Sequence, residues 1–254
     1  MISLAGRAAL VTGGSRGIGA ATVKLFAQAG ADVVFSYHRN RHAAVQVEEE
    51  ARKHGTRIET FKADAGKMRD TQRLVQFAIE RLGRLDILIA NAGIWNYDGV
   101  SIEHLTERDW EQMIRVNLKG VYAVVHHAVP HMISQGGGRI VTVSSVAGQR
   151  GTPLHSHYSA SKGGVISFTK ALSAELAPHN ILVNCVAPAF ADTDIFKRSW
   201  KDKNHLKKWL APYPLKRIAT PQEVAGPILF AVSELATFIT GEVINVNGGS
   251  FLCG

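Results

Sequence analysis

Short apolar segments alternate with segments of helical periodicity along the whole chain, and this alternation limits the folds that the chain can adopt. The apolar segments have the length of buried strands and occupy residues 7–12, 31–36, 57–64, 85–90, 139–145, 181–187 and 242–246. Apolar residues at helical spacing fill the intervals, most clearly over residues 43–54, 67–83, 106–134 and 157–177. Strands that alternate with helices pair in parallel, and strands with few polar residues are covered on both faces. The sequence therefore predicts an α/β fold, a doubly wound and mostly parallel seven-stranded sheet with helices on both faces.

The chain contains no linker, composition shift or internal repeat, so we expect one domain over residues 1–254. Its 46% hydrophobic and 20% charged residues are typical of a soluble globular protein. No apolar run approaches the roughly 20 residues of a membrane span, and the first residues resemble no signal or transit peptide. The two cysteines, Cys185 and Cys253, are too few for a disulfide framework or a zinc cluster. We expect a cytoplasmic protein with no membrane partner.

The formal net charge of +8 raises the question of an acidic partner. No recognised nucleic-acid motif accompanies this charge, so we expect no nucleic-acid partner. The charge is concentrated in residues 196–210, which hold six lysine and arginine residues against one aspartate. Such a run is usually a solvated helix face, and a basic lid over an acidic substrate is the alternative.

The segment TGGSRGIG, residues 12–19, joins the first predicted strand to the first predicted helix. Its glycines Gly13, Gly17 and Gly19 are spaced differently from the G-x-G-x-x-G dinucleotide fingerprint. Glycines at this place permit a tight turn and let a pyrophosphate approach the helix N-terminus. The position favours a nucleotide-binding, Rossmann-type turn over a glycine-rich turn that binds nothing.

Tyr158 and Lys162 are four positions apart within HYSASKGGV, residues 157–165. On a helix, residues at this spacing share one face. A lysine beside a tyrosine lowers the pKa of the phenol, because a positive charge favours the phenolate. The alternative is a chance pair of surface neighbours, which the rest of the chain must exclude.

Motifs in a fixed order make the chain similar to the short-chain dehydrogenase/reductase family over essentially its whole length. They are TGGSRGIG, NAG at 91–93, RVN ending at Asn117, the serines at 144–145, YSASK, NCVAP at 184–188 and the closing ITGEVINVNGG. Within the family, the chain looks most like the 3-oxoacyl-(acyl-carrier-protein) reductases. The resemblance implies reduction of a carbonyl to a secondary alcohol by hydride transfer from a nicotinamide cofactor.

The resemblance also implies four catalytic residues. Tyr158 would exchange a proton with the carbonyl oxygen, and Lys162, with the oxidised nicotinamide, would lower its pKa and hold the nicotinamide ribose. Ser145 would polarise the carbonyl; Ser144 competes for this role, but the spacing to Tyr158 favours Ser145. Asn117 would hold a water molecule that relays protons through Lys162, although it could also be a solvated helix residue.

The cofactor contacts implied by the resemblance follow the ends of the predicted strands. Asp64 would accept a hydrogen bond from the adenine, and Asn91 and Gly93 would line the cofactor. The full predicted set is Gly13, Ser15, Arg16, Gly17, Ile18, Gly19, Tyr37, Arg39, Asp64, Ala65, Asn91, Ala92, Gly93, Tyr158, Lys162, Pro188 and Thr193. The chain departs from the family at Ala189, which replaces the usual glycine, so the turn there is expected to be slightly rearranged.

The end of the second predicted strand indicates NADP rather than NAD. Relatives specific for NAD carry an acidic residue there, but this chain has Tyr37, and no carboxylate follows until Glu48. Arg39 and Arg16 could pair with a 2′-phosphate through charge-assisted hydrogen bonds, and Arg41 is a further candidate. The alternative is that Arg39 and Arg41 are solvated loop residues.

The substrate is left open by the sequence. A 3-oxoacyl thioester, with the basic lid at about 190–215 over an acidic carrier protein, is one possibility, although Pro130 and His179 stand where such reductases often have carrier-binding arginines. A sugar, polyol or other alcohol dehydrogenase is the second, and a non-catalytic nucleotide-binding regulator is a distant third because all four catalytic positions are intact. Trp95, Phe190, Phe196 and Trp200 could line an apolar pocket or pack in the core.

Two further expectations concern metals and assembly. His155 and His157 lie close in sequence, but no other ligand cluster accompanies them, so we expect no metal site. By resemblance, we expect a homotetramer in which the helices at 106–134 and 157–177 pack against their symmetry mates. Phe251 and Leu252 could add apolar contacts to such an interface or dock onto the core of the same chain.

Overall fold

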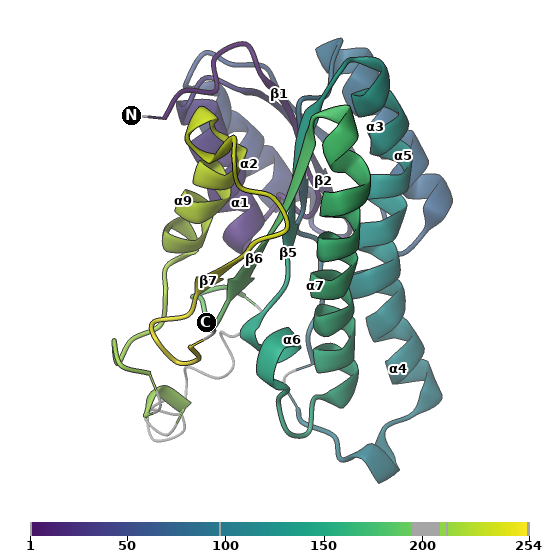
Figure 1. The fold of residues 1–254 in the computed structure, drawn as a ribbon, viewed down its shortest axis with the longest axis vertical. Coiled ribbons are helices and arrows are strands. Elements are labelled where there is room, and N and C mark those ends of the chain that lie inside the picture. Colours follow the sequence, from purple (N-terminus) through teal and green to yellow (C-terminus); the bar gives the residue numbers. More distant parts are fainter. Residues whose placement is uncertain (1, 97, 195–208, 212, 253–254) are drawn as a thin grey trace.

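The computed structural model of the protein describes residues 2–96, 98–194, 209–211 and 213–252. Its centre is a seven-stranded sheet with the strand order β3-β2-β1-β4-β5-β6-β7 (Figure 1). The strands are β1 (Ala8–Val11), β2 (Asp32–Tyr37), β3 (Ile58–Lys62), β4 (Ile87–Ala90), β5 (Gly138–Val143), β6 (Ile181–Pro188) and β7 (Val243–Val246). All six pairings between these neighbours are parallel, so the sheet is parallel throughout rather than mostly parallel as predicted. The predicted α/β class is confirmed.

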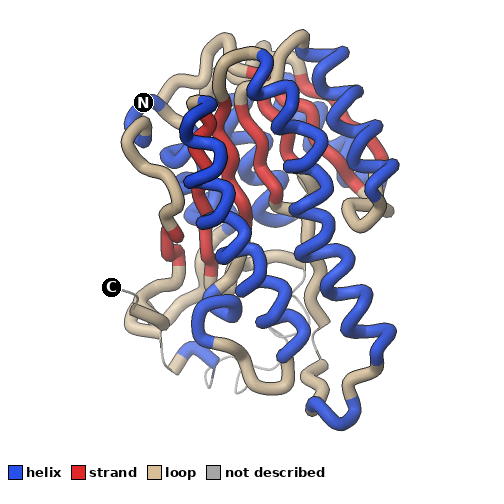
Figure 2. Tube along the Cα trace, turned by 45° about the vertical axis from the view of Figure 1, so that its right-hand side comes forward, coloured by secondary structure: helices blue, strands red, loops and turns tan. Residues whose placement is uncertain are grey.

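Helices cover both faces of the sheet (Figures 1 and 2). One face carries α1 (Gly17–Gln28), α2 (Arg41–Arg52) and α9 (Pro221–Val232). The opposite face carries α3 (Met68–Leu82), α5 (Gly120–Ser134) and α7 (Ser156–Leu176). Shorter elements are η1 (Ile102–His104), α4 (Glu107–Ile114), η2 (Arg115–Lys119), α6 (Val146–Arg150), η3 (Ala177–His179) and η5 (Glu234–Ala236). Among the described residues, no helix is both long and apolar enough to cross a membrane.

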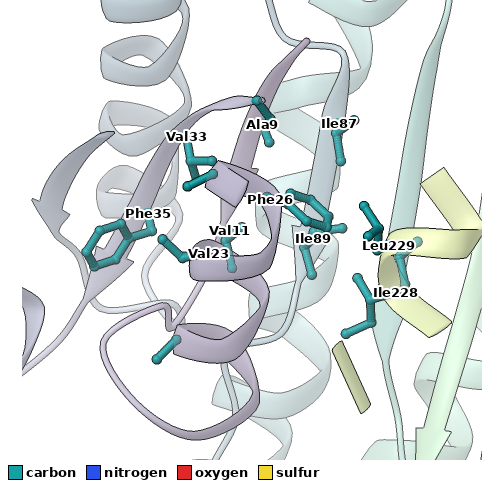
Figure 3. Close-up of a cluster of buried hydrophobic side chains, with 14 of the residues drawn as sticks. Ala9, Val11, Val23, Phe26, Val33, Phe35, Ile87, Ile89, Ile228 and Leu229 are labelled. Atoms are coloured by element: carbon teal, nitrogen blue, oxygen red, sulfur yellow. The ribbon is translucent and has the colours of Figure 1, made fainter. Parts of the chain in front are cut away.

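Each strand contributes side chains to two separate cores, because successive residues of a strand point to opposite faces. In β1, Ala9 and Val11 pack with α1 and α9, whereas Leu10 packs with the helices of the other face. Figure 3 shows the first of these cores, where Phe26 of α1 and Ile228 of α9 lie near the same strands. Burial on both faces explains why the sequences of the strands are nearly continuous apolar runs.

The segment predicted as one helix over residues 106–134 contains an interruption. α4 leads into a π-helical turn, η2, and α5 continues from it. Asn117 lies inside this turn and its side chain is fully buried. Single π-helical turns of this kind occur mostly at functional sites, and periodicity alone does not reveal them.

The start of α9 matches the sequence prediction in detail. Thr220 is the N-cap residue, Pro221 occupies the first helical position, and Glu223 completes a capping box with Thr220. The cap fixes the N-terminus of α9 on its face of the sheet.

Candidate functional site

A cavity of about 1070 Å³ opens at the carboxyl ends of the strands. In a parallel sheet with this strand order, the chain turns in opposite directions after β1 and β4, and ligands bind at that switch point. The predicted catalytic and cofactor residues all line the cavity except Asn117. Arg41, a further candidate for the phosphate, lies outside its lining.

The glycine turn after β1 has a backbone that only glycine accommodates at several positions. Gly13 and Gly17 have φ angles of +69° and +55°, which side chains disfavour. A Cβ atom on Gly19 would overlap the carbonyl oxygen of Gly13 and lie 2.6 Å from Nδ2 of Asn91. The turn therefore brings bare backbone to the rim of the cavity at the N-terminus of α1, the geometry that receives a pyrophosphate.

This turn is held by one side chain within β2 and by two side chains that directly follow β1 and β4. Nδ2 of Asn91 donates to the Thr12 carbonyl at 2.9 Å, and Oγ1 of Thr12 accepts from the backbone N–H groups of Asn91 and Ala92, each at 3.0 Å. Oγ of Ser36 accepts from the Gly13 N–H at 3.1 Å. The sequence analysis missed Thr12 and Ser36, whose only signal is a hydroxyl near the end of an apolar strand.

Ser145, Tyr158 and Lys162 come together from β5, α6 and α7. Ser145 is the N-cap residue of α6. Its hydroxyl accepts from the Ala147 N–H at 3.1 Å and lies close enough to the phenol of Tyr158 to lower its pKa. Nζ of Lys162 donates to the Val143 carbonyl at 2.8 Å and lies 6.0 Å from the centroid of the Tyr158 ring. Ser144 instead donates to the carbonyl of Lys162 at 2.7 Å, so Ser145 is the serine beside the tyrosine.

Burial dominates the pKa values of this cluster. It raises the pKa of Tyr158 to about 12, against the opposing hydrogen bond from Ser145. It lowers the pKa of Lys162 to about 8. The chain by itself therefore does not produce the lowered tyrosine pKa that is expected from Lys162 together with the oxidised nicotinamide, because removing the phenolate from water has the larger effect. Tyr158 is fully protonated near neutral pH, as a proton donor must be.

Asn117 supports the cavity without lining it. Its Oδ1 accepts from the Ile94 N–H at 2.8 Å, and its Nδ2 donates to the Ile94 carbonyl at 2.9 Å. A Cβ atom on the adjacent Gly93 would lie 3.3 Å from Oδ1 of Asn117 and 3.4 Å from Nζ of Lys162. The π-helical turn thus fixes the loop after β4 against Lys162.

Asp64 is engaged within the chain. Its carboxylate accepts from the Gly66 N–H at 3.0 Å and pairs with Nη1 of Arg115 at 3.2 Å. Burial alone would raise the pKa of Asp64, but the Gly66 hydrogen bond and the Arg115 guanidinium together lower it. Arg115 also lines the cavity, and the sequence analysis did not identify it.

The end of β2 presents basic and neutral groups to the cavity. Tyr37 is buried, whereas Arg16 and Arg39 are exposed and line the cavity with His38 and Asn40. No carboxylate from β2 or the residues directly after it lines the cavity; Asp64, after β3, is paired with Arg115. The donors at this rim suit an anionic group.

The substrate side is formed by the segments after β4, β5 and β6. Trp95 and Phe190 line the cavity, while Phe196 and Trp200 lie outside the described residues, as do most of the basic run and part of the predicted lid at 190–215. Ala189 has no positive φ, and its N–H donates to the Val246 carbonyl at 3.0 Å. The chain after β6 therefore continues in extended pairing.

The two histidines before Tyr158 have different surroundings. His155 lines the cavity, and His157 is buried within the first turn of α7. In the described part of the chain, no group of three histidine, cysteine or acidic residues is arranged to hold a metal ion.

Comparison with known proteins explains this geometry. Residues 13–250 match the family described as enoyl-(acyl carrier protein) reductase, which groups short-chain dehydrogenases. The chain belongs to the short-chain dehydrogenase/reductase family. Among curated relatives, 3-oxoacyl-(acyl-carrier-protein) reductase FabG of Aquifex aeolicus (strain VF5) is 39% identical over 98% of this chain and 99% of the relative. Dehydrogenase/reductase SDR family member 4 of Homo sapiens is 36% identical over 97% of this chain and 88% of the relative.

Solved structures of the family share the whole architecture. A putative short-chain alcohol dehydrogenase of Sinorhizobium meliloti 1021 is 33% identical, with a TM-score of 0.93 over 98% of this chain and 97% of its own. Carveol dehydrogenase of Mycobacterium avium, in complex with NAD, is 29% identical, with a TM-score of 0.93 over 98% of this chain and 99% of its own. The protein is thus an oxidoreductase that reduces a carbonyl group, uses a nicotinamide cofactor and is similar to 3-oxoacyl-thioester reductases.

Proposed function

We propose that the protein is an NADPH-dependent reductase of 3-oxoacyl thioesters. The observation that carries this proposal is the pairing of the Ser145 and Tyr158 hydroxyls beside buried Lys162, in a cavity whose opposite rim presents Arg16 and Arg39. The names of the FabG relatives support the thioester. The fold alone is compatible with many other carbonyl substrates, so the proposal depends on the residues of the site.

The residues of the chain divide the reaction between them. A bound nicotinamide supplies hydride to the carbonyl carbon of the substrate. Tyr158 donates its phenolic proton to the carbonyl oxygen, which becomes the secondary alcohol, and Ser145 donates a hydrogen bond to the same oxygen. The high pKa of Tyr158 keeps that proton in place near pH 7, so the phenol is present in the form that can donate it.

Lys162 and Asn117 assist the proton transfer without contacting the substrate carbonyl. Lys162 would hold the nicotinamide ribose and, as an ammonium group, would stabilise the phenolate left after proton transfer. Asn117 is a positioning residue that fixes the loop after β4, and a water molecule held there returns the proton through Lys162.

The remaining cavity residues would hold the cofactor. The turn at Gly13, Ser15, Arg16, Gly17, Ile18 and Gly19 fits the pyrophosphate, Asp64 and Ala65 the adenine, and Asn91, Ala92, Gly93, Pro188 and Thr193 the nicotinamide half. Tyr37 would pack beside the adenosine ribose. Arg16 and Arg39 would pair with a 2′-phosphate, which carries close to two negative charges at neutral pH.

One assay tests the reaction class. The oxidation of NADPH is followed at its absorbance band with an acetoacetyl thioester, a simple ketone, a quinone and a sugar as alternative substrates. We expect the thioester to give the highest kcat/KM. Fast turnover of the sugar and none of the thioester would favour the polyol dehydrogenase alternative instead, and turnover of none would favour a non-catalytic role.

We further propose a cytoplasmic, single-domain protomer that assembles as a homotetramer, with the thioester presented by an acidic carrier protein. Tyr122 on α5 and Trp110 on α4 are partly exposed apolar side chains on the helices expected to form the interface. Light scattering at micromolar concentration tests this assembly, and a monomer mass would refute it.

A further inference from the structure

Aromatic rings wall the substrate side of the cavity. Phe190, after β6, stacks on Trp209 with ring centroids 4.8 Å apart and planes 13° apart. Phe190 also stacks with Tyr213, with ring centroids 5.9 Å apart and planes 28° apart. Phe190, Trp209 and Tyr213 all line the cavity, and the first two are partly exposed to it. These rings form one nearly parallel stack.

Trp95 connects this stack to the reacting tyrosine. Its ring lies 6.5 Å from Trp209 at 71° and 6.4 Å from Tyr158 at 66°. On its other side, Trp95 contacts His155 at 5.0 Å and 36°. The ring plane of Trp95 is therefore steeply inclined to that of Trp209, which is stacked with Phe190. Trp95 also contacts the ring of Tyr158, which carries the proton-donating hydroxyl. We call Trp95, His155, Phe190, Trp209 and Tyr213 the aromatic wall.

The wall is mostly apolar, although Nδ1 of its histidine, His155, is buried without a hydrogen-bond partner. His155 is only 7% exposed, and burial, aided by nearby His157, lowers its pKa, so the imidazole is neutral near pH 7. Its backbone is satisfied, since its N–H donates to Thr152 and its carbonyl accepts from Ser159.

We propose that the aromatic wall selects carbonyl substrates that carry a planar, apolar ring close to the carbonyl carbon. A planar ring can meet one face of the wall by stacking and the other by its edge, the two arrangements that aromatic pairs prefer. Each such contact is worth roughly two- to tenfold in binding beyond the area it buries. A straight alkyl chain of equal size buries similar area but lacks these contacts and loses rotational freedom.

This inference rests on the proposed function for its thioester form, but ring selection applies to any carbonyl. Two matched pairs separate the two ideas. The first pair is the N-acetylcysteamine thioesters of 3-oxo-4-phenylbutanoate and 3-oxodecanoate, and the second is 1-phenylpropan-2-one and nonan-2-one. Within each pair, the groups on one side of the carbonyl have equal numbers of carbon atoms, and the phenyl ring is not conjugated to the carbonyl.

The experiment measures kcat/KM for all four compounds in the unmodified protein and in Trp95 and Phe190 variants. We expect the ring-bearing member to be preferred about tenfold in each pair that is reduced. Trp95→Ala should bring that ratio close to one, Trp95→Phe should retain most of it, and Phe190→Leu should lower it several-fold while keeping an apolar side chain. Phe238→Ala, which removes a fully exposed ring outside the cavity lining, should leave the ratio unchanged.

The outcomes are distinct. Ring preference among the ketones without thioester turnover would refute the proposed thioester reduction and support the wall's role. Thioester turnover with a ratio near one would overturn the wall's role and keep the proposed function. A ratio unchanged in both Trp95→Ala and Phe190→Leu would also overturn it, and turnover of no compound would overturn both.

Discussion

The glycine turn after β1 and the aromatic wall face the same cavity, yet they are held in place in different ways. Hydrogen bonds between the side chains of Thr12, Ser36 and Asn91 and nearby backbone groups fix the glycine turn, and a Cβ atom at Gly19 would collide with its neighbours. The aromatic wall is instead built from ring contacts between side chains of segments that follow three different strands.

The difference shows how one fold can keep its cofactor and change its substrate. Few residues can replace glycine where the backbone itself makes the contact, so the cofactor side is narrowly specified. Many apolar residues can replace a tryptophan on a loop, at a cost in selectivity rather than in folding. Tyr158 lies between the two regions, which makes it the place where they can be separated experimentally.

The largest expected effect comes from Tyr158→Phe. The variant keeps the ring and its contact with Trp95 but loses the proton donor, so kcat should fall by about a thousandfold. The dissociation constant for NADPH, measured by fluorescence titration, should remain within about twofold of the unmodified protein, since the cofactor side is untouched.

Other effects of Tyr158→Phe on kcat and on NADPH binding would contradict the separation of a cofactor side from a substrate side. If Tyr158→Phe weakened NADPH binding as strongly as turnover, the tyrosine would belong to the cofactor side. If turnover stayed close to normal with every accepted substrate, its assignment as proton donor would be wrong.

Gly19→Ala should disable the cofactor side alone. The added methyl group would overlap the Gly13 carbonyl and approach Asn91, so the turn must shift and KM for NADPH should rise about a hundredfold. The matched control is Gly226→Ala in α9, where an added Cβ has no atom within 4 Å. Equal KM values for the two variants would contradict the close approach described for Gly19.

Lys162 makes the cofactor side sensitive to pH. Burial lowers its pKa from 10.5 to about 8, so its ammonium group is present below that pH and is lost above it. Tyr158, with a pKa of about 12, keeps its proton throughout this range. We therefore expect kcat/KM for NADPH to fall about tenfold per pH unit above roughly pH 8. A flat profile to pH 10 would show that Lys162 stays charged or that its charge is not needed.

The smallest effects belong to the exposed rim of the cofactor side. Arg16→Ala and Arg39→Ala should each lower kcat/KM for NADPH several-fold and leave that for NADH nearly unchanged, because each removes one charge-assisted hydrogen bond. Tyr37→Asp should move the preference towards NADH by placing a carboxylate near the 2′-phosphate. Equal losses with both cofactors would place these arginines in a structural role.

The sequence predicts much of the cofactor side because backbone constraints restrict which residue types can occur there. Glycines mark the turn, apolar runs mark the doubly covered strands, and the capping box at Thr220 marks the start of α9. Every residue of the predicted cofactor set lines the cavity, whereas the further candidate Arg41 does not. The π-helical turn at Asn117 leaves no such mark, since apolar periodicity continues through it.

The substrate side and the electrostatics were less predictable because they depend on distant residues meeting in space. Trp95 and Trp209 are far apart in the sequence, and only the fold brings their rings within 6.5 Å. The pairing of Asp64 with Arg115 arises in the same way. Burial, which a sequence does not display, raises the pKa of Tyr158 in the chain alone, and the lowering expected from Lys162 together with the oxidised nicotinamide stays a prediction.

The central claim is that the rim formed by Arg16, Tyr37 and Arg39 makes this protein an NADPH-dependent reductase. The most direct test compares kcat/KM for NADPH and NADH in the unmodified protein, with one accepted carbonyl substrate at low ionic strength. Two charge-assisted contacts to the 2′-phosphate predict a preference for NADPH of at least about tenfold. Equal values for the two cofactors, or a preference for NADH, would contradict the account.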